Sequence, residues 1–359
     1  MNALRYERDQ REPVAFIRER ESELQGDEPG TCAMTVQELR QNNVPLVVTT
    51  VIARMKTDIR PHRNAPRYGL DHPTQDMAHA SAMGQLAYYE ALARQGVVRI
   101  ITNKQILADH WAAWEFFAQQ PEGTAPLPPL GTIITMEGAD PIVEPSELGL
   151  WWQRGLRSLM LAHFQQSCYA YGTPSREHPK DEGLTDKGRS LLKEMNAFRM
   201  PLDLTHLCDR SFAEAVDAYE GPIYSSHSNA RALADWARQL TDAQIKTITD
   251  RGGVLGLSFH IWMLFYRASH DIERKEVSLG TVADHIDHIC QLTGVAEHVA
   301  IGSDLDGGFG VEDCPNDLDT AADMHRLSSI LSDRGYTDDQ IDLICFGNWL
   351  RYWGQVLPV

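Results

Sequence analysis

The chain has 359 residues and a formal net charge of −17, from 33 Lys and Arg against 50 Asp and Glu. With 43% hydrophobic and 8% aromatic residues it can bury a full core, which excludes a mainly disordered chain. A surface this acidic repels phosphate groups. We therefore expect neither a nucleic acid nor an anionic membrane as a partner.

The sequence contains none of the segments that are typical of membrane insertion or export. No stretch approaches the ~18 apolar residues of a membrane span, and residues 1–13 have no apolar signal-peptide core. The six cysteines form no Cys-x-x-Cys pair, so we expect free thiols in a reducing compartment. Together these features predict a cytoplasmic protein.

Compact apolar runs alternate with amphipathic helical patterns along the chain. Thr35 opens a helix that leads into the β-branched run 44–52, and a longer helix follows over residues 76–95. This alternation predicts an α/β protein with a parallel sheet, either doubly wound or closed into a barrel. The other expected strands are residues 97–102, 131–136, 156–161, 201–205, 223–226, 254–258 and 298–303, and the other expected helices are 185–198, 281–292 and those opened by Ser211, Thr241 and Thr337.

Five of the expected strands end in a titratable side chain. In (β/α)₈ barrels the carboxyl ends of the strands converge on one mouth, where catalytic groups gather. Imidazole and carboxylate groups around one mouth suit a hydrolytic zinc site, which needs nitrogen and oxygen ligands. The five strand-end residues are Glu137, His163, His206, His227 and Asp304.

Each of these residues also has a purely structural reading. A single histidine after a strand is more often a structural residue than a ligand. Glu137 alone could cap the next helix, and Asp304 with Asp306 could be turn residues before two glycines. Because five strands each end in a titratable residue, we favour a functional role for these residues over a structural one.

Other sequence features give weaker signals. His285 and His288 stand three residues apart in a helical pattern, without the His-Glu-x-x-His of a metalloprotease helix, so we expect a solvated face. The chain contains no Gly-x-Gly-x-x-Gly, no phosphate-binding loop and no Gly-x-Ser-x-Gly elbow. These absences argue against dinucleotide binding and serine-hydrolase chemistry.

Seven short stretches, in order along nearly the whole chain, resemble the membrane dipeptidase (renal dipeptidase, peptidase M19) family of zinc hydrolases. The combination of Asp-Leu-Thr-His, Ser-His-Ser-Asn-Ala-Arg and Gly-Ser-Asp-Leu-Asp-Gly is highly specific. The resemblance implies a single (β/α)₈ TIM-type barrel of the metal-dependent hydrolase kind over residues 1–359, with two zinc ions in its mouth and a dipeptide as substrate. The stretches are residues 136–138, 155–163, 183–188, 203–206, 226–231, 302–307 and 348–351.

The resemblance also implies the ligands of the metal site. In the family pattern Glu137 bridges both zinc ions, and His206 and His227 complete the second site. Two zinc ions ~3.5–4 Å apart activate a water at neutral pH and polarise the scissile carbonyl. We therefore expect these three residues to bind zinc.

The same resemblance implies the residues that contact substrate. His163 would hold the substrate carbonyl or the tetrahedral oxyanion, and Asp304 would handle protons. Arg238 matches the arginine that pairs with the C-terminal carboxylate of the substrate, which favours short substrates with a free carboxyl end. Arg231 is closer to the Ser-His-Ser-Asn-Ala segment and remains a rival.

One departure from the family pattern affects the first metal site. The first strand of the family ends in His-x-Asp, which supplies two zinc ligands, and no expected strand of this chain ends in that pair; the one His-x-Asp, His285 with Asp287, falls within the expected helix 281–292. Residues 1–9 match what normally follows that pair. We therefore expect an N-terminally shortened chain that lacks the first strand and binds about one metal rather than two.

Three functions follow from these observations. The first is a zinc-dependent dipeptidase that acts through metal-bound hydroxide. The second is a non-catalytic or single-metal homologue, and the third is a hydrolase of another small amide, such as an N-acyl amino acid, or of a lactone. The sequence leaves open the side-chain preference and the oligomeric state, a homodimer among the options.

Overall fold

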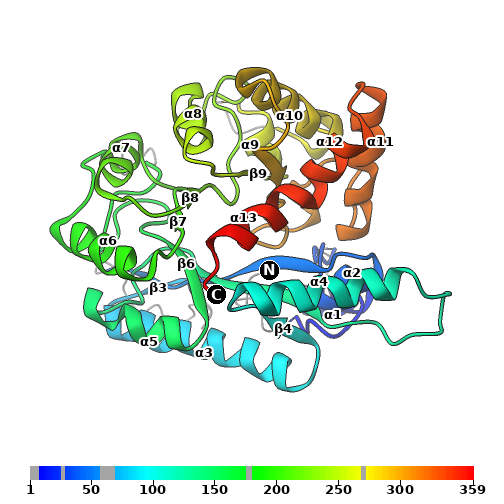
Figure 1. The fold of residues 1–359 in the computed structure, drawn as a ribbon, viewed down its shortest axis with the longest axis horizontal. Helices are drawn as coiled ribbons and strands as arrows, with labels where there is room; N and C mark the ends of the chain where they lie inside the picture. Colours follow the sequence, from blue (N-terminus) through cyan, green and yellow to red (C-terminus); the bar gives the residue numbers. More distant parts are fainter. Residues whose placement is uncertain (1–7, 26–28, 57–68, 175–179, 268–271) are drawn as a thin grey trace.

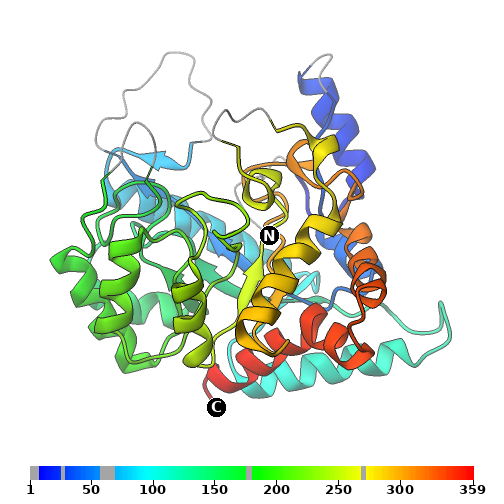
Figure 2. The same cartoon turned by 90° about the horizontal axis from the view of Figure 1, so that it is seen from above.

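The computed structural model describes residues 8–25, 29–56, 69–174, 180–267 and 272–359. Parallel strands lie at the centre, and helices cover them on the outside (Figures 1 and 2). The strands are β1 (Leu46–Val51), β2 (Arg54–Met55), β3 (Asp71–His72), β4 (Val98–Ile100), β5 (Leu130–Met136), β6 (Leu156–Met160), β7 (Leu202–Asp203), β8 (Ile223–Tyr224), β9 (Leu255–Leu257) and β10 (Val299–Ile301).

The helices follow the strands in the alternation that the sequence predicts. The longer helices bury one face against the core, whereas α2, α5, α9 and α12 are only one or two turns long. The helices are α1 (Val14–Gln25), α2 (Val36–Gln41), α3 (Gln75–Arg94), α4 (Lys104–Ala118), α5 (Leu148–Gln153), α6 (Asp186–Phe198), α7 (Asp209–Ala218), α8 (Asp242–Asp250), α9 (Ile261–Leu264), α10 (Leu279–Thr293), α11 (Arg326–Asp333), α12 (Asp338–Asp342) and α13 (Asn348–Val356).

The main sheet has the parallel order β1-β5-β6-β7-β8, with β4 paired to the first half of β5. A bridge between Ser225 and Leu255 continues this order to β9, which pairs in parallel with β10. Register aligns the strand ends, since Val51 pairs with Met136 and Met136 pairs with Leu159. The residues that follow these strands are therefore brought to one edge of the sheet.

The sequence prediction is that the family's first strand, which would precede residues 1–9, is missing, and residues 1–7 lie outside the described residues. Within the described ranges, β1 and β10 stand at the two ends of the strand order. The missing strand therefore stays a prediction.

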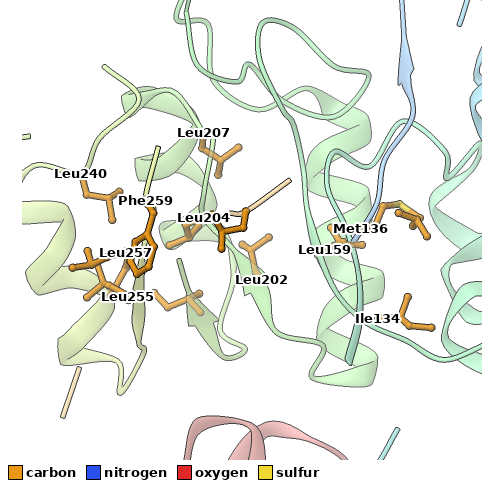
Figure 3. Packing of buried hydrophobic residues seen from close by; sticks show 14 of the residues in the cluster. Ile134, Met136, Leu159, Leu202, Leu204, Leu207, Leu240, Leu255, Leu257 and Phe259 are labelled. Atoms are coloured by element: carbon orange, nitrogen blue, oxygen red, sulfur yellow. The ribbon is translucent and has the colours of Figure 1, made fainter. Parts of the chain in front are cut away.

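Strand side chains from both halves of the sheet form one apolar core. Met136, Leu159, Leu202, Leu255 and Leu257 are fully buried and belong to one apolar cluster, and Figure 3 shows Leu202 between Met136 and Leu159 on one side and Leu255 and Leu257 on the other. Burying a leucine-sized side chain stabilises the fold by roughly 1.5–3 kcal/mol. This core holds in place the strand ends that carry the polar residues.

The helix caps confirm most of the sequence signals and correct one. Thr241 and Thr337 each form a full capping box with the Gln three residues later. Ser211 does not cap a helix, because α7 already begins at Asp209 after Cys208. The hydroxyl of Ser211 instead accepts a hydrogen bond from the backbone N–H of Tyr171.

A buried ion cluster ties the N-terminal segment to the loop after β10. The guanidinium of Arg8 pairs with Glu21, and its Nη1 atom lies 2.7 Å from Oδ1 of Asp306. Asp306 also accepts hydrogen bonds from the backbone N–H groups of Ala33 and Met34. This cluster fixes the loop that carries Asp304, two residues earlier.

Candidate active site

Four polar residues of the candidate site come after four neighbouring strands, Glu137 directly and the three histidines three residues after the strand ends. Glu137 follows β5, His163 follows β6, His206 follows β7 and His227 follows β8. His206 takes the left-handed conformation with φ 69°, which costs energy for a residue with a Cβ and points to a functional constraint. The sequence pattern, in which a titratable side chain follows an apolar run, therefore identified side chains that the fold brings together.

One carboxylate oxygen lies at the centre of this group. Oε1 of Glu137 is 3.2 Å from Nε2 of His206, and 3.5 Å from Nε2 of both His163 and His227. The Nε2 atoms of His206 and His227 are 3.1 Å apart. Glu137, His206 and His227 are all buried, and one ligand atom from each lies within 4.8 Å of the others.

The donor atoms of this trio fit a metal ion of the zinc type. Burial lowers the pKa of His206 well below its ordinary value, and the charge of Arg238 lowers it further, so its imidazole is neutral at neutral pH. Burial would raise the pKa of Glu137, but hydrogen bonds with His206 and His227 lower it well below its ordinary value. Burial would lower the pKa of His227 as well, but the nearby charges of Asp304 and Glu137 raise it, so a metal ion must displace a proton there. A carboxylate with deprotonated imidazole nitrogen is a donor set that zinc binds.

The ring of His227 is oriented by the residue before it, Ser226, and the two lie just after β8. The Nδ1 atom of His227 lies 2.8 Å from the hydroxyl of Ser226, which leaves Nε2 directed at Glu137. Asp203 accepts hydrogen bonds from the backbone N–H groups of Ser226 and Thr205, and so links β7 to β8. Such contacts behind a ligand orient its ring and tune its basicity.

Arg238 is a buried cation beside the trio. Its side chain donates to the backbone carbonyl of His227 over 2.8 Å and to the hydroxyl of Ser228 over 2.9 Å, and the residue is only 3% exposed. Among the residues that the structure describes, no carboxylate lies within ion-pair distance of its guanidinium. Burial lowers its pKa to about 10, so it remains charged at neutral pH.

Arg231, the rival arginine, is already engaged. Its two Nη atoms lie 2.8 and 2.7 Å from the two carboxylate oxygens of Asp209, and it also donates to the carbonyl of Gln239. A guanidinium held in a two-point pair has few donors left for a ligand. The geometry therefore favours Arg238 as the free anion-binding group.

Asp304 follows β10 and is half-buried, with φ 59° in the left-handed region. Burial raises its pKa to about 6, and the negative charge of Glu137 adds to this effect, while His227 and Arg238 oppose it. The mutual influence of these charges places Asp304 in the same electrostatic environment as the trio. A carboxyl group with a pKa near neutrality is suited to proton transfer.

Two further polar residues come shortly after strands and were missed by the sequence analysis. Arg54 lies three residues after the end of β1, and its Nη1 atom is 3.0 Å from Nδ1 of His163. His260 follows β9 and packs edge-on against Phe309, with ring centroids 4.4 Å apart. Burial lowers the pKa of His260 to about 4, and the charge of Arg238 contributes.

His285 is not on a solvated face, contrary to the sequence expectation. It is fully buried, its Nδ1 atom accepts from the backbone N–H of Ala230, and its Nε2 atom lies 2.9 Å from the carbonyl of Leu264. His288 is half-buried and pairs with Asp242 at 2.8 Å. His285 is therefore a structural residue that joins α10 to the loop after β8 and to the end of α9.

All six cysteines are free in the structure, as the sequence predicts. In the described ranges, none of the helices combines the length and the apolar character needed to cross a bilayer.

The parallel strands, the enclosing helices and the cluster at the strand ends define a TIM-barrel fold of the metal-dependent hydrolase kind. Residues 120–359 match the model of the family described as membrane dipeptidase (peptidase family M19). The chain belongs to this family, which confirms the resemblance drawn from its motifs.

Known proteins of similar sequence and structure agree with this assignment. An uncharacterized protein from Klebsiella pneumoniae, named for the pqqA 5′ region, is 36% identical over 169 residues, 47% of this chain and 59% of that protein. An uncharacterized dipeptidase from Schizosaccharomyces pombe is 28% identical over 225 residues, 62% of this chain and 53% of that protein. The chain thus spans about half the length of the curated relatives it matches.

A crystal structure with the same fold carries a ligand. It is a metallopeptidase from Rhodobacter sphaeroides, liganded with a phosphinate mimic of the dipeptide L-Ala-D-Ala. It aligns with a TM-score of 0.73 at 22% identity and covers 96% of each chain. This likeness shows the fold.

Proposed function

We propose that the chain is a zinc-dependent dipeptidase that hydrolyses short substrates with a free C-terminal carboxylate. The observation that carries this proposal is the buried, charged Arg238 without a carboxylate partner in the described residues, directly beside Glu137, His206 and His227. A buried cation is costly unless it is paired, so this site is built to receive an anion. Family membership and the dipeptidases among the relatives support the same substrate class.

Glu137, His206 and His227 would hold the zinc ion. A zinc ion bound there supplies Lewis acidity, which polarises a carbonyl group and activates water at neutral pH. Ser226 keeps the ring of His227 in place through its contact with Nδ1. The protein thus contributes ligands whose orientation is set before the metal binds.

Arg238 would bind the C-terminal carboxylate of the substrate. Its Nη2 atom lies 3.3 Å from Nε2 of His206, so a carboxylate on the guanidinium lies next to the metal ligands. A guanidinium–carboxylate pair is strong and directional in a site that excludes water. This contact restricts how far the substrate extends on its carboxyl side and thereby selects short peptides.

His163 and Asp304 would serve the reacting groups. Burial lowers the pKa of His163 to about 3, so its imidazole is neutral and can donate one hydrogen bond to a substrate carbonyl oxygen. Asp304 would accept a proton from water and deliver it to the leaving amine, because its raised pKa of about 6 lets it hold a proton transiently.

A single-metal or non-catalytic homologue is the second candidate. The observation in its favour is that no described strand is followed by a His-x-Asp pair, because the one His-x-Asp of the sequence, His285 with Asp287, lies within α10. Among the described residues, Glu137, His206 and His227 are the one cluster of metal-ligating side chains that lies close enough to share an ion. This candidate predicts the same single bound metal as the proposal and differs from it in slow or absent turnover.

The experiment that tests the proposal is a substrate panel with the zinc-loaded full chain. The panel holds a dipeptide, the same dipeptide with its carboxyl end amidated, and an N-acyl amino acid. The proposal predicts hydrolysis of the dipeptide and at least about 30-fold lower kcat/KM for the amidated form, which lacks the anion for Arg238. Preferred hydrolysis of the N-acyl amino acid would show another amide hydrolase, and no turnover at all would favour the non-catalytic homologue.

A further inference from the structure

We propose that Arg54 is a positioning residue that fixes which nitrogen of His163 carries the proton, so that Nε2–H faces the metal cluster. This inference rests on the proposed function, in which His163 donates a hydrogen bond to the substrate.

The contact between the two side chains allows only one direction of donation. Nη1 of Arg54 lies 3.0 Å from Nδ1 of His163. A guanidinium has N–H donors and no acceptor, so Nδ1 must be the acceptor and must be unprotonated. The single proton of the neutral imidazole then lies on Nε2, the atom that is 3.5 Å from Oε1 of Glu137.

This arrangement separates the role of His163 from that of the two other histidines. His227 has the Ser226 hydroxyl behind its Nδ1 atom, which can accept a hydrogen bond from Nδ1–H, so that Nε2 is left unprotonated and free for a metal. His163 has a cation behind Nδ1, so its Nε2 atom carries a proton and cannot bind a metal. His163 is therefore a hydrogen-bond donor in the mouth of the barrel and not a fourth ligand.

Arg54 is itself held on both sides. Its Nε atom lies 2.6 Å from Oδ1 of Asp71, and this pair joins β2 to β3. The backbone of Met55, the next residue, donates to Oδ2 of Asp140 over 2.9 Å.

Further contacts anchor the segment on which Arg54 stands. Gln85 of α3 bonds both the N–H and the carbonyl of Ile52, at 2.9 and 2.8 Å. Oδ1 of Asp140 accepts from the backbone N–H of Cys168, in the loop that follows His163. The guanidinium is therefore preorganised against His163, because its own segment and the His163 loop share the same anchor.

Nuclear magnetic resonance of the zinc-loaded full chain, labelled with ¹⁵N in its histidine rings, tests this inference. The His163 signals are assigned by their loss in His163→Gln. The inference predicts that wild-type His163 has its proton on Nε2 alone. In Arg54→Met, where the donor is gone, the Nδ1 signal should move toward the protonated range, and Arg54→Lys should restore it at least in part.

Kinetics on a dipeptide provide the second readout. Arg54→Met should lower kcat by about 10-fold or more with a much smaller change in KM, because His163 acts mainly on the developing oxyanion. Arg154→Met is the matched control, since Arg154 forms a surface pair with Glu90 at 2.8 Å, and it should leave both the spectrum and the kinetics unchanged.

The outcomes separate this inference from the proposed function. A proton on Nδ1 of wild-type His163, or His163 signals that are the same in Arg54→Met and the wild type, would overturn the inference. If the spectra change as predicted and no variant, wild type included, hydrolyses a dipeptide, the role of Arg54 stands and the proposed function fails.

Discussion

Arg238 donates from Nη2 to the backbone carbonyl of His227 over 2.8 Å, so the candidate anion-binding group and a candidate metal ligand are fixed to each other. The two residues come from one connection, between β8 and α8. A substrate carboxylate bound by the guanidinium is thereby held at a set position relative to the metal ligands. Short-substrate selectivity follows from this constraint.

Arg238→Met should lower kcat/KM for dipeptides by about 2–4 kcal/mol, or roughly 30- to 1,000-fold, because it removes one partner of a desolvated charge pair. Steady-state kinetics on purified protein measures this loss. Arg231→Met is the control, since Arg231 is held by Asp209 outside the site, and it should change kcat/KM by less than about threefold. The reverse pattern would assign the carboxylate to Arg231.

Ser226→Ala should weaken zinc binding by about 10-fold, because the variant removes the hydroxyl that orients the ring of His227 through Nδ1. Competition with a chelator of known affinity measures the change. Ser228→Ala removes the hydroxyl next to His227 on the other side, which contacts Arg238 instead. Its zinc affinity should stay near the wild-type value, and equal loss in both variants would contradict the role of Ser226.

Arg8→Met should lower the free energy of unfolding by about 3–5 kcal/mol, because it leaves the buried carboxylates of Glu21 and Asp306 without their cation. Urea denaturation measures the loss. Arg11→Met provides the comparison, since the side chains of Arg11 and its partner Asp9 are both exposed and such a surface pair should contribute much less to stability. Similar losses in both variants would show that the buried cluster is no more important than a surface pair.

Acid should destabilise the fold partly through His285. Burial lowers the pKa of this imidazole below its ordinary value of 6.5, so the folded state binds fewer protons than the unfolded state at mildly acidic pH. Stability is therefore fully present above pH 6.5 and falls as the pH drops toward the folded pKa.

His285→Gln should reduce this acid sensitivity, because a glutamine amide can replace both hydrogen bonds without titrating. The measurement is the urea midpoint of both proteins between pH 7.5 and pH 5. The variant should lose less stability over this range than the wild type. Equal losses would mean that His285 does not titrate on unfolding.

Local patterns in the sequence predicted most of the elements and identified strand-end side chains that the fold brings together, because both depend on neighbours along the chain. Thr241 with Gln244 marks a helix start, and an apolar run followed by Glu137 or His206 marks a strand end. Parallel pairing then aligns those ends whatever the loops between them do. A search for a polar side chain after every strand would also have found Arg54 and His260.

Features that depend on distant partners could not be predicted in this way. His285 looked solvated because aspartates flank it, yet its partners Ala230 and Leu264 are 55 and 21 residues away. Ser211 looked like a cap, but it serves the backbone of Tyr171, 40 residues earlier. Such contacts arise only once the strands have set the positions of the loops.

The most direct test of the central claim is the metal content of the full chain and of His227→Ala, measured by elemental analysis after zinc loading and removal of free metal. We predict about one zinc per wild-type chain, because Glu137, His206 and His227 supply the ligands, and almost none in the variant, which loses one of three ligands. Circular dichroism of both proteins confirms that the variant is folded. Unchanged zinc content in His227→Ala would contradict the account.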